Sequence, residues 1–149
     1  MKTFAKLVVL VVLLNIIRYI IGGPIESFTI MEPMHQPMIE YKDCFNSDFT
    51  NIDWASSFFY NFLVWFCAAW IFHLAQHSVS GNMIVKSFKI FGIALLFFIS
   101  ISAVFMNHYI EGIRTFYRFG MIDAVITFSI VALANGLLYP RFFRPKSAD

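Results

Sequence analysis

Long apolar runs alternate with short polar segments along the chain. Four runs of spanning length cover residues 4–21, 54–74, 88–106 and 119–139, and most charged side chains lie between them. An α-helix rises about 1.5 Å per residue and the hydrocarbon core of a bilayer is about 30 Å thick, so about 17–25 residues cross it. The runs are apolar on nearly all sides, which predicts helices and not the alternating strands of a barrel. We therefore expect an all-α, integral membrane four-helix bundle that forms a single domain, 1–149.

Composition supports the same class of protein. Hydrophobic residues make up 59% and charged residues 13% of the 149-residue chain, whereas a soluble domain is about 45–50% apolar and about 25% charged. Too few polar side chains are present to cover a surface that faces water. The first partner to expect is the lipid bilayer, and the formal net charge of +2 gives no indication of nucleic-acid binding.

The ends of the predicted helices are marked by residues that begin or stop helices. The Gly-Gly-Pro sequence at 22–24 is expected to end the first helix, and Pro140 is expected to end the fourth. Thr50 and Asp53 have the spacing of a capping box, which predicts that the second helix begins there. The segment 22–53 is then an outer loop, and loops of this length are usually functional or disordered.

Lysine and arginine residues are unevenly distributed between the two sides of the predicted bundle. Seven lie on the side that holds both termini and the 75–87 loop: Lys2, Lys6, Lys86, Lys89, Arg141, Arg144 and Lys146. The other side holds three: Lys42, Arg114 and Arg118. Basic residues favour the cytoplasmic side, so both termini are predicted to be cytoplasmic. A cell membrane is expected, and the short loops favour a bacterial inner membrane.

The first apolar run has two interpretations. Lys2 and Lys6 precede the apolar stretch 7–14, as in a secretory signal, but no small-x-small cleavage pattern follows it. We expect a retained helix rather than a cleaved signal.

Apart from Lys6 and Lys89, which lie at the ends of their spans, two charged residues lie inside the predicted spans: Arg18 and Asp123. By helical rise both are about 6–8 Å below the outer boundary, and their charges are opposite. A lone charge in hydrocarbon costs about 2.5–3.5 kcal/mol on insertion scales, so such residues usually pair or face a wet cavity. We predict that Arg18 and Asp123 face each other across the bundle.

Further polar side chains gather at the same depth. On the helices they recur at spacings of three or four residues, which places them on one face. The predicted polar layer, a candidate site for a small ligand or ion, consists of Arg18, Asn15, Ser57, Asn61, Ser100, Asp123 and Thr127. Two alternatives need no ligand. Such residues can hold helices together by hydrogen bonds, at about 0.6 kcal/mol per contact, and Arg18 can extend to the headgroups.

Two groups of residues have weaker metal-binding patterns. His73 and His77 stand at i and i+4 near the cytoplasmic end of the second helix, but no acidic residue on that side completes a site. The outer loop holds soft or borderline ligands that suit Cu(I): Met31, Met34, His35 and Met38. Imidazoles also suit a helix C-terminus, and methionine fills irregular gaps. These roles, rather than metal binding, are expected for the two groups, and no metal or other cofactor is predicted.

The chain contains no glycine-rich phosphate loop, nucleophile elbow or zinc motif. The expected function is therefore non-enzymatic, with a polar core that binds a small ligand or ion or that stabilises the packing. One alternative is an accessory subunit of a larger membrane complex, with a partner protein or a second copy against its apolar helix faces. Another is a membrane-embedded, lipid-modifying enzyme that uses Asp123, His108 or Glu111 at the outer interface.

Overall fold

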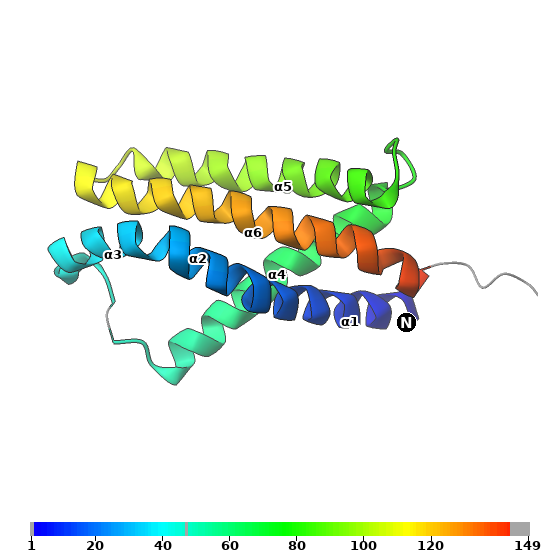
Figure 1. The fold of residues 1–149 in the computed structure, drawn as a ribbon, viewed down its shortest axis with the longest axis horizontal. Coiled ribbons are helices and arrows are strands. Elements are labelled where there is room, and N and C mark those ends of the chain that lie inside the picture. Colours follow the sequence, from blue (N-terminus) through cyan, green and yellow to red (C-terminus); the bar gives the residue numbers. More distant parts are fainter. Residues whose placement is uncertain (1, 47, 144–149) are drawn as a thin grey trace, which may run out of the picture.

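The computed structural model describes residues 2–46 and 48–143, and the regular secondary structure of these residues is entirely helical (Figure 1). The first helical stretch comprises α1 (Lys2–Ile17), a π-helical turn η1 (Arg18–Gly22) and α2 (Gly23–Thr29). The other elements, in chain order, are α3 (Met31–Glu40), the short 3₁₀ turn η2 (Lys42–Cys44), α4 (Asn51–Ala75), α5 (Met83–Met106) and α6 (Glu111–Phe143).

Four helical stretches of the described chain are long and apolar enough to cross a membrane, as in a multi-pass membrane protein. They are Lys2–Thr29, Asn51–Ala75, Met83–Met106 and Glu111–Phe143. Each contains one of the four predicted spans, so the all-α class and the number of spanning-length helices are confirmed for these residues.

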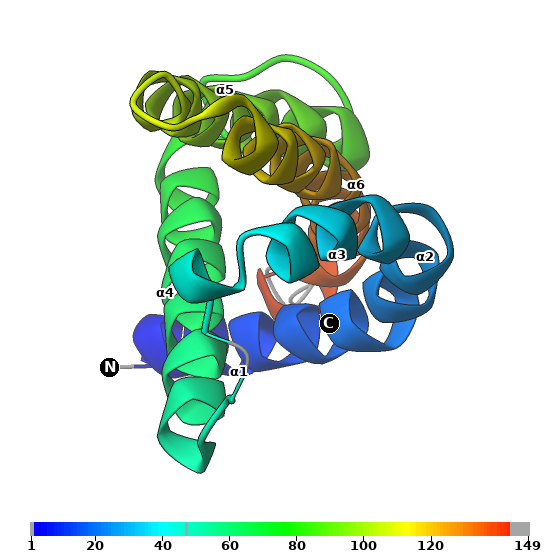
Figure 2. The same cartoon turned by 90° about the vertical axis from the view of Figure 1, so that its left-hand side faces the viewer.

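Three of the long helices lie side by side, and the fourth crosses them. In Figure 1, α1, α5 and α6 run along the long axis, whereas α4 passes obliquely from the α1 side to the start of α5. Figure 2, viewed from the end where α3 lies, shows α4 spanning the distance between α1 and α5 on one side of the bundle. We call the two ends of the bundle the α3 end and the termini end. The termini end holds the start of α1, the turn between α4 and α5, and the end of α6 (Figure 1).

The Gly-Gly-Pro sequence does not end the first helix, which corrects the prediction. The backbone widens into a π-helical turn at Arg18–Gly22, and Pro24 lies in the first turn of α2. Proline is tolerated there because its fixed φ suits a helix and the first turn does not need its missing N–H. The helical stretch therefore continues to Thr29.

The segment predicted as an outer loop is largely helical and packed. Helix α3 lies against α6, and the ring of Phe45 is 4.9 Å from that of Phe116. A Cβ added at Gly112 would overlap the ring of Tyr41, so α6 accepts this ring only because it carries glycine there. The prediction of a loop over 22–53 is therefore wrong for most of the segment.

Helix α6 is longer than predicted at both ends. It begins at Glu111, whose carboxylate suits the positive end of the helix dipole. Pro140 lies inside the last turn rather than after the helix, which corrects the second stop signal. The ammonium group of Lys6 donates a 2.7 Å hydrogen bond to the carbonyl of Phe142, one of the terminal carbonyls that have no partner within a helix.

The capping prediction for the second spanning helix is confirmed. The Thr50 hydroxyl accepts a hydrogen bond from the Asp53 amide at 3.3 Å, and Asp53 Oδ2 accepts one from the Thr50 amide at 2.8 Å. Helix α5 begins in a similar way, because Asn82 Oδ1 accepts from the Val85 amide at 2.9 Å. Gly81, with φ of +116°, forms the preceding turn, a conformation that favours glycine.

The core lies where α1, α4 and α6 meet, with α5 held against α6. Its largest fully buried side chains include Tyr139, Phe72, Phe91, Leu10 and Val131. Small residues allow α5 and α6 to approach closely, since a Cβ added at Gly136 would lie 2.6 Å from Ile84 Cα. In contrast, α5 exposes large apolar side chains along its other face, among them Ile93, Leu96 and Phe97.

Candidate functional site

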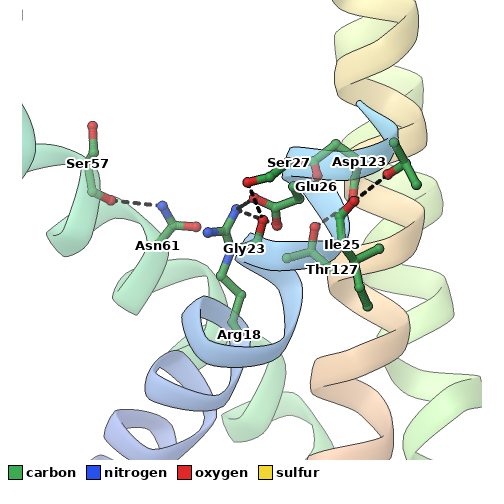
Figure 3. A network of polar contacts seen from close by, with 10 residues as sticks. Arg18, Gly23, Ile25, Glu26, Ser27, Ser57, Asn61, Asp123 and Thr127 are labelled. Atoms are coloured by element: carbon green, nitrogen blue, oxygen red, sulfur yellow. Dashed lines mark hydrogen bonds and ion pairs between the residues drawn. The ribbon is translucent and has the colours of Figure 1, made fainter. Parts of the chain in front are cut away.

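Arg18 forms an ion pair with Glu26, two turns further along the same helical stretch. Its Nη2 lies 3.0 Å from Oε1 and 3.1 Å from Oε2 of Glu26, and both side chains are 14% exposed (Figure 3). The π-helical turn places them on one face, because it takes up one extra residue and makes the i, i+8 spacing equivalent to i, i+7 of a regular helix. The partner predicted for Arg18 was Asp123, so this prediction is corrected.

Asp123 nevertheless lies beside the Arg18–Glu26 pair. Figure 3 shows Arg18, Glu26 and Asp123 in a row between α4 and α6. Asp123 interacts electrostatically with both Arg18 and Glu26. Its Oδ1 is buried and accepts no hydrogen bond from any described residue. We call these three side chains the Arg18 cluster.

Other residues of the predicted polar layer lie at the edges of this cluster. On α4, the Asn61 side chain donates to the Ser57 carbonyl at 3.0 Å and lies on the side of α4 that faces Arg18 (Figure 3). On α6, the Thr127 hydroxyl donates to the Asp123 carbonyl. The structure therefore brings together polar side chains from three of the four long helical stretches.

Two residues of the predicted layer behave differently. Ser100 is exposed, and its hydroxyl donates to the Leu96 carbonyl at 2.7 Å, so α5 adds no side chain of the predicted layer to the cluster. Asn15, one turn before Arg18, is fully buried, and neither atom of its amide has a hydrogen-bond partner in the described chain. A buried polar group in this state costs about 1–3 kcal/mol.

The Arg18 cluster has an excess of negative charge. It contains two carboxyl groups and one guanidinium group, and the Arg18 and Glu26 side chains are mostly removed from solvent. The buried Asp123 Oδ1 accepts no hydrogen bond within residues 2–46 and 48–143, whereas Glu26 is paired with Arg18. An arrangement of this kind attracts a cation or a hydrogen-bond donor, because an unpaired buried charge is unfavourable.

The two groups with weak metal-binding patterns lie at different places in the structure. No group of three or more His, Cys, Asp or Glu side chains that could hold a metal ion occurs among the described residues. The second pattern, which was predicted to lie in a loop, instead forms part of α3 at i, i+3, i+4 and i+7: Met31, Met34, His35 and Met38. Met31 and His35 are exposed, and Met34 and Met38 are partly buried.

His73 and His77 belong to a second polar cluster, at the termini end. We call it the histidine cluster, and it also contains Gln76 and Tyr139. His73 Nδ1 lies 2.6 Å from the hydroxyl of Tyr139, and Gln76 Nε2 donates to the same hydroxyl at 2.7 Å. His77, which is exposed, has its Nε2 3.4 Å from Gln76 Nε2. No sequence pattern singled out Tyr139 and Gln76 as partners, because a contact between residues 63 positions apart leaves no periodic signal in either helix.

The described residues line two notable cavities on the surface of the bundle. One, of about 660 Å³, is a groove between α4 and α5 with an almost entirely apolar lining that includes Leu63, Cys67, Phe97 and Phe128. The other, of about 490 Å³, lies beside the histidine cluster at the termini end. The two cysteines, Cys44 and Cys67, are free and exposed.

Two of the residues considered for a lipid-modifying enzyme, Glu111 and Asp123, lie well apart on α6. Glu111 Oε1 lies 2.6 Å from Arg118 Nη1, and its Oε2 lies 3.6 Å from Arg114 Nη1. Asp123 follows Glu111 on the same helix about 18 Å further along its axis, by helical rise. Glu111 therefore belongs to an exposed ion-pair network at the start of α6.

Comparison of the chain with protein-family models, with curated proteins and with solved structures found no match to any of them.

Proposed function

We propose that the protein spans a membrane four times, with both termini on the cytoplasmic side of a cell membrane, in particular a bacterial inner membrane. Four long apolar helices support this arrangement, as does the exposure of large apolar side chains such as Phe97 and Leu96. Basic residues at the termini end, among them Lys6 and Lys86, support the orientation. The lipid bilayer is then the surrounding solvent of α5 and of most of α4.

Within this arrangement the Arg18 cluster binds a small cation, and the protein is non-enzymatic. The observation that carries this proposal is the buried Asp123 oxygen without a donor, next to an Arg18 guanidinium that Glu26 already occupies. Two carboxylates cannot both be neutralised by one guanidinium, so a sodium-sized cation or a proton supplies the missing positive charge. The cluster then works as a cation-binding site in the half of the bundle nearer to α3.

Thermal unfolding of the purified protein in a neutral detergent tests this proposal. Replacing choline chloride by NaCl at constant ionic strength is expected to raise the Tm of the wild type, because a ligand that binds only the folded state stabilises it. The Tm of Asp123→Asn is expected not to respond to Na⁺. Glu111→Gln is the matched control, since it removes an exposed acid from the same helix and is expected to respond like the wild type.

Infrared spectroscopy distinguishes a bound proton from a bound sodium ion in the Arg18 cluster. If the bound ion is a proton, Na⁺ has no effect on the Tm, and the wild type shows the absorption band of a protonated carboxyl group, which is lost in Asp123→Asn or Glu26→Gln. If neither a Na⁺ effect nor such a band is found, the proposal is wrong.

One observation favours a second candidate, an accessory subunit. The groove between α4 and α5 is lined by Ala68, Ala75 and Ala94 as well as larger apolar residues, and small residues permit close approach of a transmembrane helix. The occupant is then one spanning helix of a partner protein. Cys67 lies in this groove and is exposed, so a photoreactive thiol reagent attached there in membranes is expected to form one discrete cross-linked product. Cross-linking to lipid alone would exclude this candidate.

A further inference from the structure

The cavity at the termini end combines polar side chains from two helices. Its polar lining comes from His73, Gln76 and His77 at the end of α4 and from Tyr139 near the end of α6. The Tyr139 and Gln76 side chains are 1% and 5% exposed, and the ring of Phe143 stacks on that of Tyr139 with centroids 4.5 Å apart. The packed ring of Phe143 therefore helps to hold the Tyr139 hydroxyl in place beside the cavity.

Hydrogen bonding in this cluster leaves imidazole N–H donors for a ligand, together with one acceptor, the buried Gln76 Oε1, which has no partner within the described residues. The amide nitrogen of Gln76 can only donate, so the Tyr139 oxygen accepts from it at 2.7 Å. The hydroxyl proton of Tyr139 is then directed to Nδ1 of His73, 2.6 Å away. A neutral imidazole whose Nδ1 accepts carries its proton on Nε2. The second imidazole, that of His77, is exposed at the mouth of the cavity.

The charges around this cavity are positive. The ammonium group of Lys86 donates to the Gln76 carbonyl at 2.7 Å, and Lys86 is one turn from the cavity-lining Met83. The ammonium group of Lys6 bonds the Phe142 carbonyl and lies 5.6 Å from the Phe143 ring. Residues 2–12, 70–92 and 130–143, which form this end, include no aspartate or glutamate.

Helix dipoles do not cancel this positive charge. Helices α4 and α6 both end here, and each C-terminus has roughly half a negative charge. The Lys6 and Lys86 ammonium groups have a full charge each, and each binds a terminal carbonyl. Net positive potential with imidazole N–H donors disfavours a metal cation and favours an anion with several acceptor oxygens.

We infer that this cavity binds a phosphate group, carried either by the headgroup of an anionic phospholipid or by a soluble phosphorylated compound. Basic pockets between membrane helices bind anionic headgroups in this way, and the cavity volume of about 490 Å³ leaves room for more than the phosphate itself. This inference uses a different site from the Arg18 cluster and does not depend on the proposed cation binding.

Native mass spectrometry and thermal unfolding of the full-length protein test the inference. The probes are phosphatidylglycerol, phosphatidylcholine and inorganic phosphate. His77→Gln and Lys86→Gln are the test variants. Lys89→Gln is the matched control for Lys86, because Lys89 lies on the same helix but its ammonium group donates to Ser80. His35→Gln is the control for His77, since it is an exposed histidine at the α3 end.

If the site takes a lipid headgroup, the wild type retains phosphatidylglycerol in preference to phosphatidylcholine, and each test variant retains it about fivefold less than its control. If it takes a soluble compound, inorganic phosphate raises the Tm of the wild type and of both controls but not that of the test variants. The inference is wrong if the wild type shows no preference for phosphatidylglycerol over phosphatidylcholine and inorganic phosphate does not raise its Tm. It is also wrong if the control variants lose as much binding as the test variants.

Discussion

Arg18, Glu26 and Asp123 share one positive charge between two acids, and this imbalance sets the energetic role of each side chain. Glu26 makes the direct contact with Arg18 at 3.0 Å, whereas Asp123 interacts with it only at longer range. Removing one partner of a mostly buried ion pair leaves the other charge uncompensated, which costs more than the pair itself contributes. The contact with Glu26 is therefore expected to dominate the stability of the cluster.

A double-mutant cycle with Arg18→Met and Glu26→Gln is expected to show a coupling energy of about 1 kcal/mol or more. The cycle with Arg18→Met and Asp123→Asn is expected to show a smaller one, because no direct contact joins these two side chains. Unfolding of the purified variants in detergent measures both cycles. A larger coupling for Arg18 with Asp123 would restore the pair expected from the sequence.

Asn15 and Asn135 are both fully buried, but their amides have different surroundings. Neither polar atom of the Asn15 side chain has a partner in the described chain, whereas in Asn135 only Oδ1 lacks one, because its Nδ2 donates to Ser87 Oγ at 3.0 Å. Asn15→Leu is therefore expected to raise the free energy of unfolding by about 1–3 kcal/mol. Asn135→Leu, the matched control, is expected to lower it, because the Ser87 hydroxyl loses its partner. A loss of stability in Asn15→Leu would indicate that this amide has a bound partner.

At the scale of elements, close helix contact decides which glycines are required. A Cβ at Gly136 would lie 2.6 Å from the Ile84 Cα atom, which is backbone and cannot move aside like a flexible side chain. A Cβ at Gly92, on the partner helix α5, would meet nothing within 4 Å. The two positions therefore make a matched pair for the same substitution.

Gly136→Ala is expected to lower the free energy of unfolding by about 1–3 kcal/mol, the usual cost of overpacking. Gly92→Ala is expected to raise it by about 0.5–1 kcal/mol, because alanine favours a helix. Thermal unfolding of both variants under the same conditions gives the comparison. Equal effects at the two positions would contradict the close packing of α5 on α6.

At the scale of the whole molecule, two regions with different chemistry lie at different levels along α4 and α6. The Arg18 cluster follows α1 and lies in the first half of α6, whereas the histidine cluster lies where α4 and α6 end; the ends of these two helices meet at the termini end (Figure 1). The Arg18 cluster has more carboxyl groups than basic groups, whereas the ammonium groups of Lys6 and Lys86 lie near the histidine cluster. This separation suits the proposed cation site and the proposed phosphate site, one at each level.

The proposed topology predicts which cysteines react in intact cells. In a Cys67→Ala background, Cys44 near the α3 end is expected to react with a membrane-impermeant maleimide without permeabilisation, because it is exposed. A cysteine at the exposed position Ser80, in the turn between α4 and α5, is expected to react only after permeabilisation when Cys44 is also replaced by alanine. The opposite pattern of labelling would invert the topology.

Some features of the protein follow from local sequence alone. Long apolar runs determine the spanning-length helices, because their composition and length leave few other ways to satisfy the backbone. The capping box of Thr50 and Asp53 was predictable because its hydrogen bonds join residues three positions apart. Arg18 and Asp123 were recognisable as members of one polar region because each is a lone charge at matching depth in an apolar run.

Other features depend on tertiary structure. Whether Pro24 and Pro140 stop a helix depends on what surrounds them, and both lie within helical turns here. The π-helical turn brings Glu26 onto the face of Arg18, so the partner of Arg18 came from the same helical stretch rather than from α6. The contact of Tyr139 with His73 joins residues 66 positions apart. Sequence patterns with helical period describe the face of one helix, whereas these contacts depend on how helices cross.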